Sequence, residues 1–173
     1  MPLTLPPSGA ASWAVTLHRG TYRISFTNQN DCPVGPTPCQ SRQLDLARPL
    51  VADGSLTFDL PVVEVSGTVT HNQQPVGPSS GGERGELLFR EANAGAVAAR
   101  LGRSGAAQYR ARLFPASYQV LFRNTSDCPT IDNQPLPCQG EVEVESGVPL
   151  TATGSRDFNL QSATLSGVVQ VNG

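Results

Sequence analysis

The chain has 173 residues with 12 basic and 14 acidic side chains, and its formal net charge of −2 lacks the basic surplus with which proteins bind nucleic acid or anionic membranes. All 12 basic residues are Arg, which excludes lysine Schiff-base chemistry, a Walker-type lysine and Lys–Asn isopeptide crosslinks. Because no stretch approaches the roughly 18 apolar residues of a membrane-spanning helix, we expect no membrane insertion and no nucleic-acid partner.

Short segments in which apolar and polar residues alternate run through the whole chain, and this period of two is typical of half-buried β-strands. In chain order the strand candidates are Trp13–Leu17, Tyr22–Phe26, Leu44–Leu46, Leu56–Leu60, Val63–Val69, Leu87–Phe89, Tyr109–Leu113, Tyr118–Phe122 and Glu141–Glu145. Residues 91–101 are rich in Ala, but Asn93 and Gly95 interrupt them, so we interpret this stretch as a loop leading to a strand. Strands spaced by about ten residues, with Gly, Pro and Asn between them, predict an all-β antiparallel sandwich.

The sequence repeats itself after about one hundred residues. Early matches lie 96 positions apart, and the offset rises to 99 and then 100 beyond the paired cysteines, so the length difference falls in the loop between them. The matched pairs include Ser8–Ala11 with Ser104–Ala107, Tyr22 with Tyr118, Phe26 with Phe122, Asp31–Pro33 with Asp127–Pro129, Pro38–Gln40 with Pro137–Gln139, and Phe58 with Phe158.

This period is the size of one small sandwich domain and too long for a solenoid repeat. We therefore predict tandem antiparallel β-sandwich domains of Ig-like or transthyretin-like type. Residues 1–63 are the C-terminal part of a first repeat, here called the first unit, and residues 64–163 are a complete second repeat, the second unit. Residues 164–173 repeat the opening of the second unit and are interpreted as the first strand of a third repeat.

The second unit resembles the carboxypeptidase regulatory-like domain, a transthyretin-like (prealbumin-like) β-sandwich repeat of bacterial surface proteins. The resemblance rests on Val65–Val69, the turn at Pro75–Gly77, the strand Gly85–Phe89 and the segment Tyr109–Val120. The sequence departs from the family pattern at Gln73, where Gly is usual, although Asn172–Gly173 restores it in the next repeat. The resemblance implies an accessory, adhesive or structural module, and it transfers no catalytic residue and no cofactor.

Four cysteines lie in equivalent loops of the two units, and we predict that they form local disulfides, Cys32 with Cys39 and Cys128 with Cys138. Such bonds persist in oxidising compartments, so we expect an extracellular, cell-surface or periplasmic protein. A zinc site is the alternative, but these spacings lack the close pairs of a structural zinc site, and His18 and His71 are not equivalent in the repeat.

A calcium site is the next alternative, because Asp127, Asp132 and Asn133 cluster in the second cysteine loop. The first loop keeps only Asp31, so Asx turns at Asp31 and Asp127 explain these residues more simply. We therefore predict no metal site.

Catalytic groups are sparse in the sequence. The two histidines, His18 and His71, do not recur and no Gly-x-Ser-x-Gly motif is present, so a Ser–His triad is not expected. Glu141, Glu143 and Glu145 would share one strand face about 7 Å apart, and an exposed polar face explains them better than a glycosidase pair. We expect no enzyme. Trp13 and Tyr109 occupy equivalent positions and are interpreted as core or rim aromatics, and Asn124–Ser126 forms a glycosylation sequon.

The favoured hypothesis is a non-catalytic structural repeat module of an extracellular or cell-surface protein, acting as a stalk, adhesin or filament subunit. The first unit lacks an opening strand, and the segment at the other end of the chain copies one, so neighbouring copies would associate head to tail by strand complementation. The residues of this donor strand are Leu165, Val168, Val169 and Val171. The alternative is an accessory module that binds a glycan or a protein through the cysteine-closed loops, which differ between the units.

Overall fold

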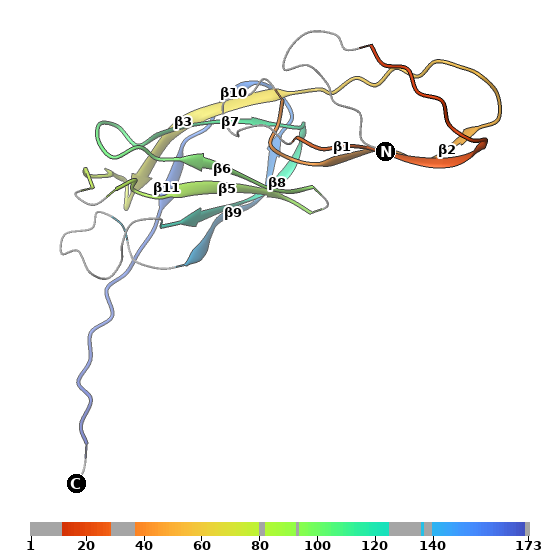
Figure 1. The fold of residues 1–173 in the computed structure, drawn as a ribbon. Helices are drawn as coiled ribbons and strands as arrows, with labels where there is room; N and C mark the ends of the chain where they lie inside the picture. Colours follow the sequence, from red (N-terminus) through yellow and green to blue (C-terminus); the bar gives the residue numbers. More distant parts are fainter. Residues whose placement is uncertain are drawn as a thin grey trace.

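The computed structural model describes residues 12–28, 37–79, 82–92, 94–124, 136 and 140–171, and among these it contains strands and no helix (Figure 1). The all-β prediction is therefore confirmed for these residues. The strands are β1 (Gly20–Phe26), β2 (Arg42–Leu50), β3 (Val63–His71), β4 (Gln74–Pro75), β5 (Glu86–Glu91), β6 (Gly95–Arg100), β7 (Gln108–Leu113), β8 (Ala116–Arg123), β9 (Glu141–Leu150), β10 (Gly154–Ser155) and β11 (Phe158–Leu160).

Two sheets of the second unit face each other. One is the antiparallel sheet β6-β5-β8-β9, and the other is arranged around β3, which pairs with β4, β7, β10 and β11. Strand β6 begins at Gly95, and Ala92 and Ala94 before it are in a turn, so the prediction that this stretch leads into a strand is confirmed. The alternating side chains of both sheets point into the space between them, and this pattern is the reason that the two sheets stack.

The second sheet is not purely antiparallel, which corrects the sequence prediction. Strands β10 and β11 run parallel to β3, with Gly154 opposite Val65 and Phe158 opposite Val69. The physical reason is the route of the chain. Strand β9 ends at Leu150, beside the start of β8 and at the end of the sandwich where β3 begins, so the next segment crosses to the other sheet and runs the same way as β3.

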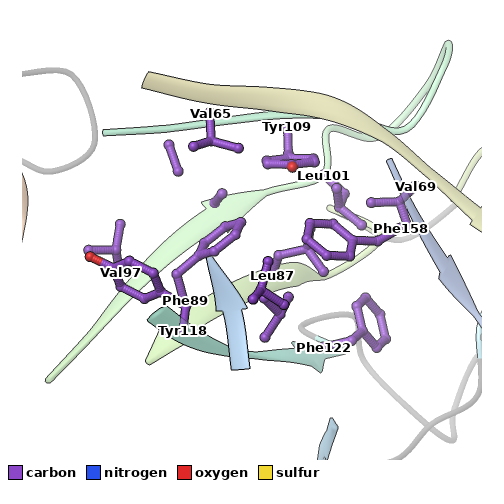
Figure 2. Close-up of a cluster of buried hydrophobic side chains, with 14 of the residues drawn as sticks. Val65, Val69, Leu87, Phe89, Val97, Leu101, Tyr109, Tyr118, Phe122 and Phe158 are labelled. Atoms are coloured by element: carbon purple, nitrogen blue, oxygen red, sulfur yellow. The ribbon is translucent and has the colours of Figure 1, made fainter. Parts of the chain in front are cut away.

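The core lies between the two sheets and is built around four aromatic rings (Figure 2). Phe89 from β5 has its ring centroid 5.6 Å from that of Tyr109 and 6.4 Å from that of Tyr118. Phe158 from β11 contacts both Phe89 and Tyr109. The strand periodicity of two explains this arrangement, because it sends every second side chain of β5, β7, β8 and β11 inward.

The first unit contributes one antiparallel strand pair, β1 with β2, and this pair has the same register as β8 with β9. Gly20 is opposite Leu50 and Phe26 is opposite Arg42, while Ala116 is opposite Leu150 and Phe122 is opposite Val142. Both pairs carry register irregularities at equivalent places, flanking Ile24 in β1 and Val120 in β8. Residues matched in the sequence therefore hold matching positions in these two strand pairs.

Three predicted strands are not strands in the structure. Residues 13–17, 56–60 and 165–171 have no sheet pairing. The equivalents of the first two are β7 and β11, which pair with β3 in the second unit. Residues 12–62 contain no copy of β3, β5 or β6, so 13–17 and 56–60 have no such partner within the described chain. The third segment leads away from the sandwich (Figure 1).

Candidate functional site

A pocket of about 420 Å³ lies at the end of the sandwich from which the C-terminal segment leaves. Its walls come from the end of β8, the start of β9, the last residue of β3 and the chain that follows β11. The lining residues are His71, Phe122, Val142, Glu143, Val144, Asn159, Leu160, Gln161, Ser162 and Ala163. Apolar side chains of β8, β9 and β11 form one part of the wall, and polar groups of the other residues surround it.

Ser162 is held at the rim of this pocket by the turn that follows β3. Its Oγ lies 2.7 Å from His71 Nε2 and accepts a hydrogen bond from Asn72 Nδ2 at 3.3 Å. Its backbone N–H donates to Asn72 Oδ1 at 3.0 Å, and the Asn72 N–H donates to the Leu160 carbonyl at 2.8 Å. These bonds fasten the chain just before the predicted third repeat.

No sequence pattern predicts the contact between His71 and Ser162, and its geometry invites comparison with a catalytic pair. A Ser–His nucleophile needs a third group that orients the imidazole. Within the part of the chain that the structure describes, no hydrogen bond joins a carboxylate to His71, and the contact is exposed to solvent. Asn72 binds both the hydroxyl and the backbone N–H of Ser162, and these bonds anchor the chain after β11 to the turn after β3.

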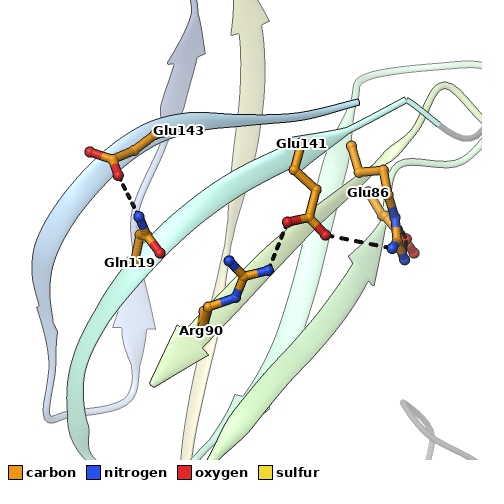
Figure 3. A network of polar contacts seen from close by, with 6 residues as sticks. Glu86, Arg90, Gln119, Glu141 and Glu143 are labelled. Atoms are coloured by element: carbon orange, nitrogen blue, oxygen red, sulfur yellow. Dashed lines mark hydrogen bonds and ion pairs between the residues drawn. The ribbon is translucent and has the colours of Figure 1, made fainter. Parts of the chain in front are cut away.

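Glu141 and Glu143 of β9 lie on the exposed side of the sheet and bind side chains of β5 and β8 (Figure 3), whereas Glu145 binds Arg156, which lies between β10 and β11 beside the other sheet. Glu141 Oε2 accepts from Arg90 Nη2 at 2.7 Å, Glu143 Oε2 accepts from Gln119 Nε2 at 2.5 Å, and Glu145 pairs with Arg156. Cross-strand pairs of this kind stabilise an exposed sheet face by a few tenths of a kcal/mol each.

The first unit packs against the second through the end of β1 and β2 that carries the cysteine loop. Phe114 is fully buried, and its ring meets that of Phe26 edge to face with centroids 6.1 Å apart. The Arg42 guanidinium lies 4.8 Å from the centroid of the same ring. Gln40 is only 2% exposed, and its Oε1 is 3.1 Å from the Tyr118 hydroxyl. We call this contact the joint.

Both units contain the same tyrosine contact at the start of the strand before the cysteine loop, and the same asparagine contact beside that loop. Tyr22 donates to the carbonyl four residues earlier, that of His18, at 2.6 Å, and Tyr118 donates to the Phe114 carbonyl at 2.7 Å. Asn28 donates to the Pro38 carbonyl at 3.0 Å, and Asn124 donates to the Leu136 carbonyl at 3.4 Å. In each unit, an asparagine at one end of the cysteine loop binds a backbone carbonyl at the other end. The ends of the two loops are therefore held together by the same contact.

The residues predicted as site residues fall in different places. Cys39 is disulfide-bonded and packs against the core, whereas Cys32, Cys128 and Cys138 lie outside the described residues, so the pairing stays a prediction. The calcium candidates Asp31, Asp127, Asp132 and Asn133 also lie outside them. Among the described residues, no cluster of three His, Cys, Asp or Glu side chains is placed to hold a metal ion.

The donor-strand residues are highly exposed: Leu165 is 98%, Val168 87%, Val169 92% and Val171 90% accessible. Tyr109 is a core residue, as predicted, and its repeat equivalent Trp13 is 40% exposed. The described residues also contain no helix long and apolar enough to cross a membrane.

Some residues of the joint and of the pocket carry no signal in the sequence. Phe114, Arg42 and Ser162 were not singled out, because none recurs as the same residue type in the repeat. The recurring pair Phe26 and Phe122 was the available signal, since Phe26 lies in the joint and Phe122 lines the pocket.

No protein-family model matches the chain, and no curated protein matches it. Among solved structures, it is similar to a DUF3823 family protein from Parabacteroides merdae, with a TM-score of 0.39 and 19% sequence identity. The match covers 58% of this chain and 46% of that one, so it spans less than half of the solved protein. The resemblance to carboxypeptidase regulatory-like domains stays a prediction.

Proposed function

We propose that the chain is a non-catalytic structural module of an extracellular or cell-surface protein, in which β-sandwich repeats pack end to end as a stalk, adhesin or filament subunit. The observation that carries this proposal is the strand pair that occurs twice with one register, irregularities included. The joint supports it further, because a buried aromatic contact between successive units limits the bending of a string of domains. The disulfide at Cys39 supports an oxidising location.

The binding-module alternative has less support at the first cysteine loop. Cys39 packs against the core of the second unit, and the next residue, Gln40, is buried in the joint. The described end of this loop, at Cys39 and Gln40, therefore contributes to the contact between units. For the second loop, exchanging residues 129–137 for the first-loop sequence tests the alternative: glycan or protein binding that depends on this exchange would favour a binding function over a structural one.

The joint provides the test of the structural proposal. In ¹⁵N relaxation measurements, amides of β1 and β2 should share one rotational correlation time with amides of β5 and β8, because both units tumble as one body. The variant Phe114→Ala removes the ring between Phe26 and Arg42 and should give β1 and β2 a shorter correlation time. Phe58→Ala, the same change in an unpaired segment of the first unit, is the control. Independent tumbling in the unchanged protein would argue against a stiff module.

Head-to-tail strand complementation is the second part of the proposal. Residues 165–171 copy the sequence of β3, and their apolar side chains are exposed. In the first unit, the copies of β7 and β11 have no β3 beside them. Segment 165–171 of another copy would supply that strand, antiparallel to residues 13–17 and parallel to residues 58–60, as β3 pairs with β7 and β11.

Gly167 gives this pairing a specific requirement. Its equivalent Gly67 has no room for a side chain, because a Cβ there would lie 1.9 Å from the Arg156 carbonyl oxygen. We therefore expect the 173-residue chain to self-associate, and both deletion of residues 164–173 and Gly167→Val to leave monomers in sedimentation velocity. Gln170→Val is the matched control that adds a branched side chain elsewhere in the segment. Oligomers that survive the deletion would contradict the strand model.

A further inference from the structure

We propose that the pocket binds the His18–Tyr22 corner of a second copy of this chain, and that this contact is equivalent to the joint. This inference rests on the proposed head-to-tail association, and it identifies the second surface by which the copies meet. The pocket would hold the neighbouring first unit beside the strand that segment 165–171 supplies to it.

The first step of the argument is the equivalence between the pocket and the observed joint. In the joint, Phe26 and Arg42 are directly opposed across β1 and β2, and together they hold the Phe114 ring. In the second unit, Phe122 and Val142 are opposed in the same way across β8 and β9. These two side chains line the pocket. The pocket is therefore the equivalent, in the second unit, of the place that Phe114 fills in the first.

The second step identifies the occupant. Phe114 lies four residues before Tyr118, whose hydroxyl binds its carbonyl, and in the first unit the same bond joins Tyr22 to His18. His18 thus holds the Phe114 position of the repeat, and it is exposed. An imidazole is smaller than a phenyl ring and fits a pocket of about 420 Å³ together with neighbouring side chains.

Charge also favours this occupant. The corner carries the exposed side chain of Arg19 beside His18, and the exposed Arg23 follows it directly. Glu143 is one of the residues that line the pocket, and its carboxylate binds the uncharged Gln119, whereas Glu141 already pairs with Arg90 and Arg123. Opposite charges on the two surfaces would orient the approach, and the contact should weaken as ionic strength rises.

The route of the chain makes the two contacts compatible. Residues 161–163 form part of the pocket wall, and the donor segment begins directly after them. Residues 61–62 hold the equivalent position at the joint. They directly precede β3, and β3 belongs to the unit whose Phe114 packs on Phe26. A first unit that receives segment 165–171 from a neighbour would therefore have its own corner at the neighbour's pocket. Because donor and acceptor surfaces differ, the contact does not close on itself and would extend into a chain of copies.

The test rebuilds the observed joint between two copies. The double variant His18→Phe, Val142→Arg recreates the set Phe, Phe and Arg found in the joint, and it should tighten self-association about tenfold. Val142→Asp places a charge beside Glu143 in the pocket and should weaken association by a similar factor. Leu46→Asp changes another exposed apolar residue, 69% accessible against 37% for Val142, outside both surfaces and is the control. Sedimentation velocity over a concentration series gives the association constants, and circular dichroism confirms that each variant is folded.

The outcomes separate this inference from the strand model. If deletion of residues 164–173 gives monomers while neither pocket variant changes the association constant, the pocket inference is wrong and strand complementation stands. If oligomers survive the deletion but disappear with Val142→Asp, the pocket is the main contact and the strand model is wrong. A double variant that associates no more tightly than the unchanged chain, when tested at both low and moderate ionic strength, would overturn the pocket inference.

Discussion

Gln73 shows how a single residue carries a conformational cost in this fold. It lies in the two-residue turn between β3 and β4 with a φ of 65°, and Asn72 before it has a φ of 50°. This left-handed region costs an ordinary residue about 1–2 kcal/mol relative to Gly. The turn is retained because the Gln73 N–H donates to Asn159 Oδ1 at 2.8 Å and because β3 and β4 pair on either side of it.

We expect Gln73→Gly to raise the free energy of unfolding by about 0.5–1 kcal/mol, since the relief of strain exceeds the added backbone entropy of the unfolded chain. The backbone hydrogen bond to Asn159 does not need the side chain and would remain. Gln74→Gly, one position later in β4, lacks the positive φ and should lower stability by about 0.5–1 kcal/mol. Urea unfolding of both variants measures the difference, and a loss of stability in Gln73→Gly would contradict this explanation.

Gly67 is required for a different reason, the close approach of two backbones. The chain between β10 and β11 bends toward β3 at this position, where the Arg156 N–H donates to the Ser66 carbonyl at 2.8 Å and the Tyr109 hydroxyl donates to the Arg156 carbonyl at 2.6 Å. We expect Gly67→Ala to cost about 3 kcal/mol or more, because the added methyl group would displace this backbone. Gly154→Ala in β10, where nothing lies within 4 Å, should be tolerated in the same thermal unfolding assay.

At the scale of elements, Arg84 ties the loop before β5 to the loop between β6 and β7. Its guanidinium is buried and, among the described residues, forms no ion pair with a carboxylate; Nε donates to the Gly102 carbonyl at 2.6 Å and Nη1 to the Gly105 carbonyl at 2.8 Å. Further donations reach the Val76 and Ala106 carbonyls. Burial lowers the pKa of Arg84. The surrounding carbonyl dipoles replace the water that the charge has lost.

Replacing this guanidinium should therefore lower the free energy of unfolding more than replacing a surface arginine does. We expect Arg84→Met, which keeps most of the volume and removes every donor, to lower the free energy of unfolding by about 3 kcal/mol or more, since several buried carbonyls lose their partners. Arg84→Lys offers three donors without the planar fork and should recover only part of this loss. Arg103→Met, an exposed arginine in the same loop region, should change stability by less than about 0.5 kcal/mol. Chemical denaturation compares the three.

The elements also show what a sequence can predict. Tyr22–Phe26 and Tyr118–Phe122 alternate and have partners in the chain, so both are strands where the pattern indicated them. Residues 13–17 alternate equally well but form no strand, because a sheet needs a neighbour and the periodicity of one segment says nothing about its partner. The parallel pairing of β10 and β11 follows from the crossing of the chain between sheets, which no local pattern encodes.

The pocket and the joint belong to the scale of the whole molecule, and local patterns predict them least. His71 and Ser162 meet across 91 positions of sequence, and Gln40 reaches Tyr118 across 78. The repeat does show which residues of the two units are equivalent. Because Phe114 packs on Phe26 in the joint, the equivalent residue Phe122 marks the pocket as the place where we propose the same contact.

The joint should respond to alkaline pH through Tyr118. Its hydroxyl lies between the Phe114 carbonyl and Gln40, and burial, with the negative charge of Glu91 as the next cause, raises the pKa of Tyr118 to about 12 from 10.0. Because the folded protein holds this proton more tightly than the unfolded chain, the stabilisation is complete below about pH 10 and is lost as the pH rises toward 12.

Over that interval the free energy of unfolding should fall by about 1.4 kcal/mol per pH unit from Tyr118, in addition to the loss from Tyr109, whose pKa burial also raises. Tyr118→Phe cannot ionise, so its stability should be lower at neutral pH but should decline less steeply between pH 10 and 12. Urea unfolding at several pH values measures both slopes. If the two proteins lost stability at the same rate over this range, the buried proton of Tyr118 would not be linked to folding, and the contact with Gln40 would not couple the two units through it.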